Sequence, residues 1–510
     1  MQTADLLVLV LYVAAVVWLG ARFSRRQRSI RDYFLTGRQV PWWALLGSIV
    51  ATETSTITLI SVPGYAFGAD LTFLQLALGY VVARVLVALV LLPVFFRSEL
   101  LTVHQLLTAR FGSAAGRVAA SLFLTTRSLS DGLRLFATGL VLAAVLATVP
   151  AAERLAGAVA PALDSSTALL VAAIAIVGAA TLLYTLLGGM LAVVWADVAQ
   201  MVVYLGGALL AGVILLAEIP GGCAEVAARA DAAGKLRLFD FALDLSRSYT
   251  FWSGLVGGAF ITAATHGADQ LLVQRYLCCR SAADARRALV ASGFVVLIQF
   301  WLLLLIGLML WTYYTAHDPA ALAAVSSGGQ VQTDRVFPLF ITSHLPTGVK
   351  GLVVAAMVAA AMSTLSSSLN SSAASTVGDF YVPLTRGARS ESHYLRAARW
   401  ATVGWGAVQV LVALAAIALS QRVVDEALGI QSFTGGLLLG ALSLCFLTTR
   451  AGAATPIAGL AAGAAVLLAV RAATDVSWQW YALIGSVTTY AAGRAVSALQ
   501  RGAPASGGSG

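Results

Sequence analysis

Seven hydroxyl side chains lie within twelve residues of an otherwise apolar stretch, AMSTLSSSLNSS, from Ala361 to Ser372. Ser363, Ser366 and Ser367 are spaced i, i+3 and i+4, so a helix would place their oxygen atoms on one face. Neutral oxygens on one face can bind a small hard cation, and Na⁺ is the natural candidate. The alternative is that these hydroxyl groups bond carbonyls of their own helix or let two helices pack closely.

A second polar segment, from Ala51 to Thr56, can supply further oxygen ligands. Local unwinding there would free the carbonyls of Ala51 and Thr54 to meet a cation together with the hydroxyl groups of Ser363 and Thr364. The same segment holds Glu53, an ionisable group that costs about 2.5 to 3.5 kcal/mol at the centre of a membrane helix. Glu53 is either a proton- or solute-binding group or the structural partner of an arginine.

Asp197 is the candidate for the negative charge that neutral hydroxyl groups lack. It lies in the segment GGMLAVVWADVAQ, about two turns after a glycine pair that would start a helix. A carboxylate there can face the serine row. The alternative is an acidic residue that the helix dipole favours in the first turns of a helix.

A row of charges marks a third apolar stretch. Arg127, Asp131 and Arg134 are spaced i, i+4 and i+7 and so share one helix face. Asp131 can neutralise one arginine only. The surplus positive charge, joined by Arg84, can meet Glu53 or an anionic solute, because arginine binds carboxylates through two parallel hydrogen bonds. A purely structural network of ion pairs is the alternative.

Other polar side chains in apolar stretches are candidates for lining a solute cavity, and for each the alternative is an interhelical hydrogen bond. They are Ser55, Thr56, His266, Asp269 and Gln431.

The composition requires a membrane protein. Of 510 residues 59% are hydrophobic and 11% charged, and the mean hydropathy is +0.86. Apolar runs long enough to cross about 30 Å of hydrocarbon recur along the chain. We predict about thirteen transmembrane helices, near residues 4–23, 42–68, 71–97, 117–147, 165–188, 190–218, 250–275, 288–314, 347–381, 397–420, 424–449, 455–472 and 478–498.

Charge asymmetry predicts the topology. Basic residues follow the first apolar run, at Arg22, Arg25, Arg26, Arg28 and Arg31, which places the N-terminus outside and, with an odd number of spans, the C-terminus in the cytoplasm. The net charge of +9 therefore reflects topology in the cytoplasmic membrane, and no nucleic-acid partner is inferred. Four cysteines show neither a disulfide framework nor metal-ligand spacing.

The spans fall into two blocks of five. Because each block has an odd number of spans, the second block is inverted in the membrane relative to the first. Inverted repeats of this kind are typical of transporters with discontinuous helices at the binding site. The first span of each block should be the broken one, with Pro63 and Gly64 in the first and Gly254 to Gly267 in the second. We predict an extra N-terminal helix and basic loop (1–40), a first repeat (41–218), an extracytoplasmic loop (219–246), a second repeat (247–450), two accessory helices (451–500) and a disordered tail (501–510).

Several segments, in order, resemble the sodium:solute symporter family. They are WWALLGSIVATETSTITLISVPGYAFG, LTVHQLLTARFG, GGMLAVVWADVAQMVVYLGG, DQLLVQRYLCCRSAADAR and AAAMSTLSSSLNSSAASTVGDFY, within residues 42–381. The resemblance implies an all-α, LeuT-like core of five plus five inverted helices. It also implies Na⁺-coupled uptake of a small organic solute by alternating access.

The resemblance also implies ligands. The main Na⁺ site of the family falls here on Ala51, Thr54, Ala360, Ser363 and Thr364. A second Na⁺, bound by some members, falls on Asp197, Ser363, Ser366 and Ser367. The helix with Thr262, Thr265 and His266 and the helix with Gln431 contribute to solute pockets in relatives. Thr265 replaces an aromatic inner gate of the sugar carriers, and their amide-rich contacts are mostly missing, which argues against a sugar.

The sequence thus predicts a Na⁺/solute symporter whose solute is a small carboxylate or zwitterion. A proton-coupled carrier of the same fold is the nearest alternative, because Glu53 and Asp197 can carry H⁺. A membrane sensor would need an output domain, for which the chain has no room. An intramembrane enzyme is disfavoured because the spans hold neither HExxH nor GxSxG.

Overall fold

The structure is a computed structural model that describes residues 3–23, 27–98, 100–159, 161–327, 329–418, 430–448 and 452–502. Arg25, Arg26 and most of the predicted tail lie outside these ranges. The described helices are α1 (Thr3–Phe23), α2 (Ile30–Leu35), α3 (Trp42–Glu53), α4 (Thr56–Gly68), α5 (Gln75–Arg97), α6 (His104–Phe111), α7 (Ser113–Leu146), α8 (Pro150–Val159), α9 (Ser165–Ala217), α10 (Gly222–Ala232), α11 (Gly258–Gly267), α12 (Gln270–Leu277), α13 (Ala282–Ala316), α14 (Val336–His344), α15 (Val349–Ser375), α16 (Val382–Leu384), α17 (Glu391–Ala415), α19 (Ile430–Leu447), α20 (Ala454–Ala473) and α21 (Tyr481–Gly502).

Eight of the described helices are long and apolar enough to cross a membrane, or nine when the bent pair α3 and α4 counts as one span. The longest, α9, has 53 residues. At 1.5 Å per residue it is about 80 Å long, more than twice the hydrocarbon thickness. Gly189 divides it with a positive φ of 55°, so α9 supplies both of the spans predicted over 165–218.

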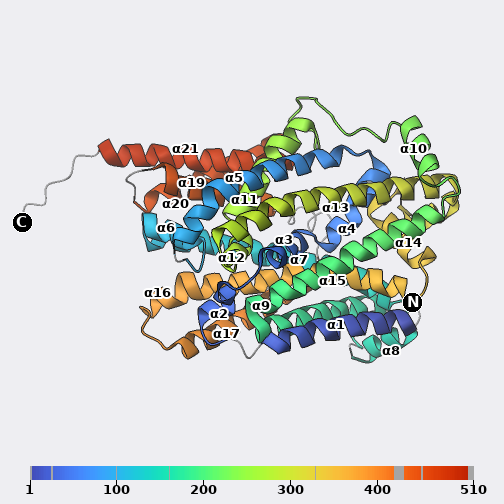
Figure 1. Cartoon of the computed structure of the whole chain (residues 1–510), viewed down its shortest axis with the longest axis horizontal. Helices are drawn as coiled ribbons and strands as arrows, with labels where there is room; N and C mark the ends of the chain where they lie inside the picture. Colours follow the sequence, from blue (N-terminus) through green and yellow to red (C-terminus); the bar gives the residue numbers. More distant parts are fainter. Residues whose placement is uncertain are drawn as a thin grey trace, which may run out of the picture.

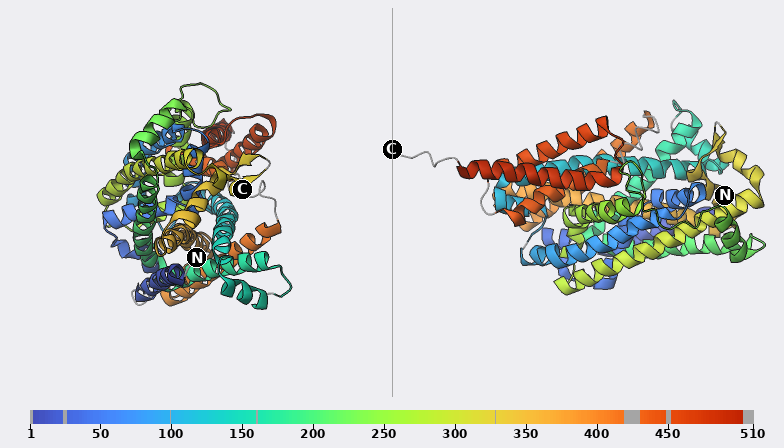
Figure 2. Two further views of the ribbon diagram at one scale, coloured as in Figure 1. Left: turned by 90° about the vertical axis from the view of Figure 1, so that its right-hand side faces the viewer. Right: turned by 90° about the horizontal axis from the view of Figure 1, so that it is seen from above.

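The helices form one elongated bundle around α15 (Figures 1 and 2). In its most apolar 18-residue window α15 is 89% buried, whereas the corresponding window of α1 is 22% buried. α15 packs along α9 and also contacts α1, α7 and α17. The hydroxyl-rich segment of the sequence is therefore in the protein interior and does not face lipid.

Both repeats begin with an interrupted helix, and the second break follows Gly267, the last of the glycines that predicted it. A π-helical turn, Ser253–Gly257, leads into α11, and the interruption comes later, at Ala268 and Asp269 before α12. Gly254 instead permits close packing, because a Cβ atom there would lie 2.6 Å from the Gln75 carbonyl oxygen.

The interhelical segments carry little regular structure. The strands β1 (Ser326–Ser327) and β2 (Gln330–Val331) pair antiparallel. At the opposite end of the bundle, Val40 forms a parallel bridge to Cys279, with its amide 3.1 Å from the Cys278 carbonyl. This bridge joins the segment after α2 to the segment after α12, and both cysteines are fully buried there.

Candidate ion and solute site

The first core helix breaks inside the bundle, in the polar segment that predicted the break. α3 ends at Glu53 and α4 begins at Thr56, with a bend of 66° between them. Thr54 and Ser55 have extended backbone, and the Ser55 hydroxyl group accepts from the Thr58 amide at 3.3 Å, which caps α4. The last turn of α3 therefore presents carbonyl groups that lack helical amide partners.

α15 places its hydroxyl row against this break. The Thr364 hydroxyl lies 3.3 Å from the Thr52 carbonyl of α3 and 3.3 Å from the Ala360 carbonyl of its own helix. On the α4 side of the break, the Thr56 hydroxyl donates to the Met357 carbonyl at 2.7 Å. Oxygen atoms from two touching helices thus converge in the buried core. We call this place the ion junction.

The predicted main Na⁺ ligands are divided between the ion junction and other partners. Ala51, Ala360 and Thr364 belong to the turns that form the junction. The Thr54 hydroxyl donates to a carbonyl one turn back at 2.9 Å, and the Ser363 hydroxyl donates to a carboxylate of α9 at 2.6 Å. The hydroxyl groups of Thr54 and Ser363 are therefore engaged elsewhere, and of the predicted ligands Thr364 alone has its hydroxyl at the junction.

The donor set fits a hard monovalent cation. The junction contains carbonyl and hydroxyl oxygens only, which suit alkali and alkaline-earth ions better than transition metals. Among the described residues, no group of three or more His, Cys, Asp or Glu residues could hold a metal ion.

Asp197 gathers the residues that were predicted for a second Na⁺. Its carboxylate accepts from the Ser363 hydroxyl at 2.6 Å and from the Ser48 hydroxyl at 2.5 Å. The Ser366 and Ser367 hydroxyl groups donate to the Ser363 carbonyl at 3.0 and 2.6 Å. The predicted residues therefore form one buried polar cluster, which Ser48 joins.

Arg275 of α12 completes this cluster and was not predicted as part of it. Its guanidinium lies 3.1 Å from Asp197, donates to the Ser48 hydroxyl at 3.0 Å and also donates to Ser367. Arg275 and Asp197 are both fully buried. Arg275 is the last residue of a predicted span, and no local spacing links it to an aspartate 78 residues away.

A cavity of about 560 Å³ extends from the broken helix to the interhelical segments. Its inner end contains Thr52, Glu53 and Thr364, and its loop end contains Thr333, Asp334 and Trp478. Six predicted solute-binding residues line it: Glu53, Ser55, Arg127, Arg134, Thr262 and Thr265.

The other predicted solute-binding residues lie outside this lining. Thr56 and Asp131 line a separate hole of about 10 Å³, which also touches Arg134 and the ion junction at Thr364. His266 is fully buried and contacts Glu53 at 2.5 Å. Gln431 belongs to α19, but its side chain lies outside the part that the structure describes.

Four ion pairs of arginine with carboxylate among the described residues surround the cavity. Glu53 pairs with Arg84, and Arg127 pairs with Asp269. Asp131 lies 2.9 Å from Arg134 and 3.6 Å from Arg127. The sequence predicted a surplus of positive charge on the face of Arg127 and Arg134. The structure balances Arg84 with Glu53 and Arg127 with Asp269, a long-range pairing that the spacing on one helix did not reveal.

The loop end of the cavity is lined by aromatic side chains, which the sequence did not predict. The tyrosine and tryptophan side chains in its lining have polar atoms, but their positions in the sequence did not indicate a solute cavity. The aromatic residues that line the cavity are Tyr65, Phe73, Tyr80, Tyr249, Phe300 and Trp478.

A bundle of apolar helices with a broken helix, a buried set of converging carbonyl and hydroxyl oxygens and an adjacent cavity is typical of cation-coupled membrane carriers. The model of the sodium:solute symporter family matches residues 33–463. The chain therefore belongs to the sodium:solute symporter family.

Individual relatives agree with this assignment. The chain is 30% identical over 492 residues to the sodium/sialic acid symporter NanT of Aliivibrio fischeri, covering 95% of this chain and 91% of the relative. It is 30% identical over 455 residues to the sodium/iodide cotransporter of Homo sapiens, covering 89% and 66% of the two chains. Another relative is the sodium-coupled monocarboxylate transporter 1 of Mus musculus, 30% identical over 87% of this chain and 68% of the relative.

Solved structures confirm the fold class. A substrate-bound, outward-open Na⁺-coupled sialic acid symporter superposes with a TM-score of 0.85 at 27% identity, covering 98% of each chain. Mhp1, a nucleobase-cation-symport-1 family transporter, shares the fold at a TM-score of 0.53 and 14% identity. The protein is thus a Na⁺-coupled solute symporter with a LeuT-like fold, as the sequence predicted.

Proposed function

We propose that the solute is a small monoanionic carboxylate that binds in the cavity beside Arg134. The observation that carries this proposal is the position of Arg134, which lines both the large cavity and the hole next to the ion junction. Its side chain is 26% exposed, whereas that of its partner Asp131 is 1% exposed. The cation of this pair therefore faces the solute space, and its counter-ion lies behind it.

The charge balance of the site supports an anion. The three arginines and three carboxylates of the ion pairs around the cavity balance in charge, and the oxygens of the ion junction are neutral. A Na⁺ bound there adds one positive charge to a buried region, where an uncompensated charge is costly. A carboxylate bound nearby offsets that charge, so each ligand favours the binding of the other.

The solutes carried by the relatives agree in charge. Sialic acid, iodide and monocarboxylates are all carried by similar proteins, and all are monoanions at neutral pH. Sialic acid is also a carboxylate on a sugar ring. The departures from the sugar carriers at Thr265 therefore argue against a neutral sugar and leave acidic sugars open.

We assign the main Na⁺ to the ion junction, with ligands from Ala51, Thr54, Ala360, Ser363 and Thr364. Of these, Ser363 and Thr54 would contribute by turning a hydroxyl lone pair or a carbonyl toward the ion. A second Na⁺ is assigned to the cluster of Asp197, Ser363, Ser366 and Ser367. The charge pattern further supports an N-terminus outside the cell and a cytoplasmic C-terminus.

Uptake by proteoliposomes tests this proposal. Wild-type protein should accumulate a radiolabelled monocarboxylate under an inward Na⁺ gradient and should not do so when choline replaces Na⁺. Arg134→Ala should raise the KM for the carboxylate by about tenfold or more, the range expected for loss of a charge-assisted hydrogen bond. Arg134→Lys should recover part of the loss, because it restores the charge without the planar fork.

A matched control is Arg229→Ala on α10, which removes an exposed arginine 2.8 Å from Glu225. It should leave uptake unchanged. Uptake that is equally fast in wild type, Arg134→Ala and Arg127→Ala would refute the anion site.

A further inference from the structure

The segment from α10 to α11 crosses the loop end of the solute cavity and brings one strained tyrosine into its lining. Tyr249 has a φ of 57°, a left-handed conformation that is uncommon for a bulky residue. Such strain persists only where surrounding contacts fix the backbone, and it clusters at ligand-binding positions. Tyr249 lines the cavity, so its conformation places a large ring at the entrance to the solute space.

The ring of Tyr249 closes an aromatic row at this entrance. Its centroid lies 4.9 Å from that of Tyr65 on α4 and 4.9 Å from that of Phe73, just before α5. Phe73 continues the row to Phe300 of α13, at 5.2 Å. The row thus joins α4, the segment before α5, and α13, and Tyr249 is its member from the segment between α10 and α11.

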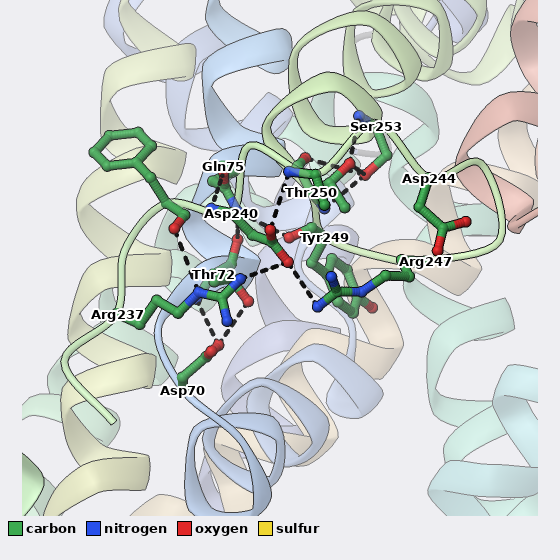
Figure 3. Close-up of polar contacts among 12 residues, drawn as sticks. Asp70, Thr72, Gln75, Arg237, Asp240, Asp244, Arg247, Tyr249, Thr250 and Ser253 are labelled. Carbon is green, nitrogen blue, oxygen red and sulfur yellow. Dashed lines mark hydrogen bonds and ion pairs between the residues drawn. The ribbon is translucent and has the colours of Figure 1, made fainter. Parts of the chain in front are cut away.

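A buried glutamine fixes the backbone that carries Tyr249. The Gln75 side chain donates to the Tyr249 carbonyl at 2.8 Å and accepts from the Asp240 amide at 3.1 Å (Figure 3). Gln75 is 1% exposed and is the first residue of α5. One side chain therefore attaches two points of the loop to the end of a membrane helix.

Ion pairs and caps hold the loop on both sides of Tyr249. The Asp240 carboxylate lies 2.6 Å from Arg237 and 2.7 Å from Arg247 (Figure 3). The Asp240 carbonyl also accepts from the amide of residue 251 at 2.6 Å. Thr250 and Ser253 cap each other, with the Thr250 amide 2.9 Å from the Ser253 hydroxyl. These contacts fix the backbone on each side of the strained residue.

We propose that Tyr249 determines which solutes enter the cavity: its ring bounds the loop end of the solute space and sets the size of carboxylate that the carrier accepts. This inference rests on the proposed function for the choice of solute. It adds a specificity-determining residue that contributes no ligand to the ion junction and lies on a loop outside the core helices.

Opposite changes of size at this position test the proposal. Tyr249→Gly removes the ring and relieves the positive φ, so it should raise the KM for a small carboxylate by about tenfold, the worth of one or two aromatic contacts. It should also let a bulkier carboxylate compete for uptake. Tyr249→Phe keeps the ring and should behave as wild type. Tyr249→Trp should exclude the bulkier carboxylate while it retains the small one.

The measurement is Na⁺-dependent uptake of labelled propionate, benzoate and a sialic acid, with KM, kcat and the Na⁺ activation curve determined for each variant. When each variant is saturated with carboxylate, the Na⁺ curve should not move, because Tyr249 does not touch the ion junction. If Tyr249→Gly does not fold, as judged by thermal unfolding, the size preference of Tyr249→Trp alone tests the role of Tyr249.

The outcomes separate the two proposals. Uptake that depends on Arg134 but keeps the same KM and size preference in Tyr249→Gly and Tyr249→Trp would overturn the role of Tyr249. Wild-type protein that takes up none of the three carboxylates would instead overturn the proposed function.

Discussion

Thr364 links the two halves of the ion junction through a single hydroxyl group. It lies 3.3 Å from the Thr52 carbonyl of α3 and belongs to α15. Thr364→Val keeps the side-chain volume and removes the oxygen, so it should raise the Na⁺ concentration for half-maximal uptake by about tenfold or more. Thr364→Ser should stay near wild type. Thr488→Val, which removes a hydroxyl bonded within α21, is the matched control.

The buried Arg275–Asp197 pair predicts an effect on the free energy of unfolding. Arg275→Met leaves a fully buried carboxylate without its cation, which should cost about 3 to 5 kcal/mol of unfolding free energy. The double variant Arg275→Met with Asp197→Asn should recover part of this loss. Thermal or denaturant unfolding in detergent measures it, and equal stability of wild type and Arg275→Met would show that the carboxylate is solvated or protonated.

Side-chain types and their spacing predicted the hydroxyl row, Glu53 at the break and Asp197 beside the serines. They did not predict which arginine meets which carboxylate. Asp269 and Arg275 find their partners across helices, at sequence separations of 142 and 78 residues. A local pattern carries no information about such pairs, because the three-dimensional packing of the helices decides them.

At the scale of elements, hydropathy predicted the spans because each apolar run must be long enough to cross the bilayer. The sequence located the second break only to the glycines between Gly254 and Gly267, because glycine serves two purposes. Gly189 provides a positive φ, whereas Gly254 and Gly79 let backbones approach closely. Composition alone does not distinguish these uses.

Gly79 allows the close packing of α5 against the π-helical turn to be tested. A Cβ atom at Gly79 would lie 2.3 Å from the Gly254 carbonyl oxygen, so Gly79→Ala should push α5 away from the π-helical turn. We expect a loss of about 1 to 3 kcal/mol, the usual cost of overpacking. Gly206→Ala in α9 has no atom within 4 Å and should be neutral or slightly stabilising. Thermal unfolding compares the two, and equal melting temperatures would contradict the close contact.

The dependence of uptake on membrane potential reports how many sodium ions the whole carrier moves with each solute. A monoanion carried with one Na⁺ moves no net charge, and with two Na⁺ it moves one positive charge, worth about 2.3 kcal/mol per 100 mV. The hydroxyl groups that donate to Asp197 keep lone pairs for an ion. We therefore expect a valinomycin-induced, inside-negative potential to accelerate uptake in wild type but not in Asp197→Asn. Potential-independent wild-type uptake would argue against the second ion.

The bridge between Val40 and Cys279 has a practical consequence. Cys278 and Cys279 are buried where two segments meet. The Cys278 thiol lies 3.7 Å from the Phe34 carbonyl of α2, and the Cys279 thiol lies 3.5 Å from the Val40 carbonyl. Any rearrangement that parts these segments uncovers two reactive sulfurs. With Cys223 and Cys445 replaced by serine, the rate of maleimide labelling of the two native cysteines would report how often this end of the carrier opens during a transport cycle.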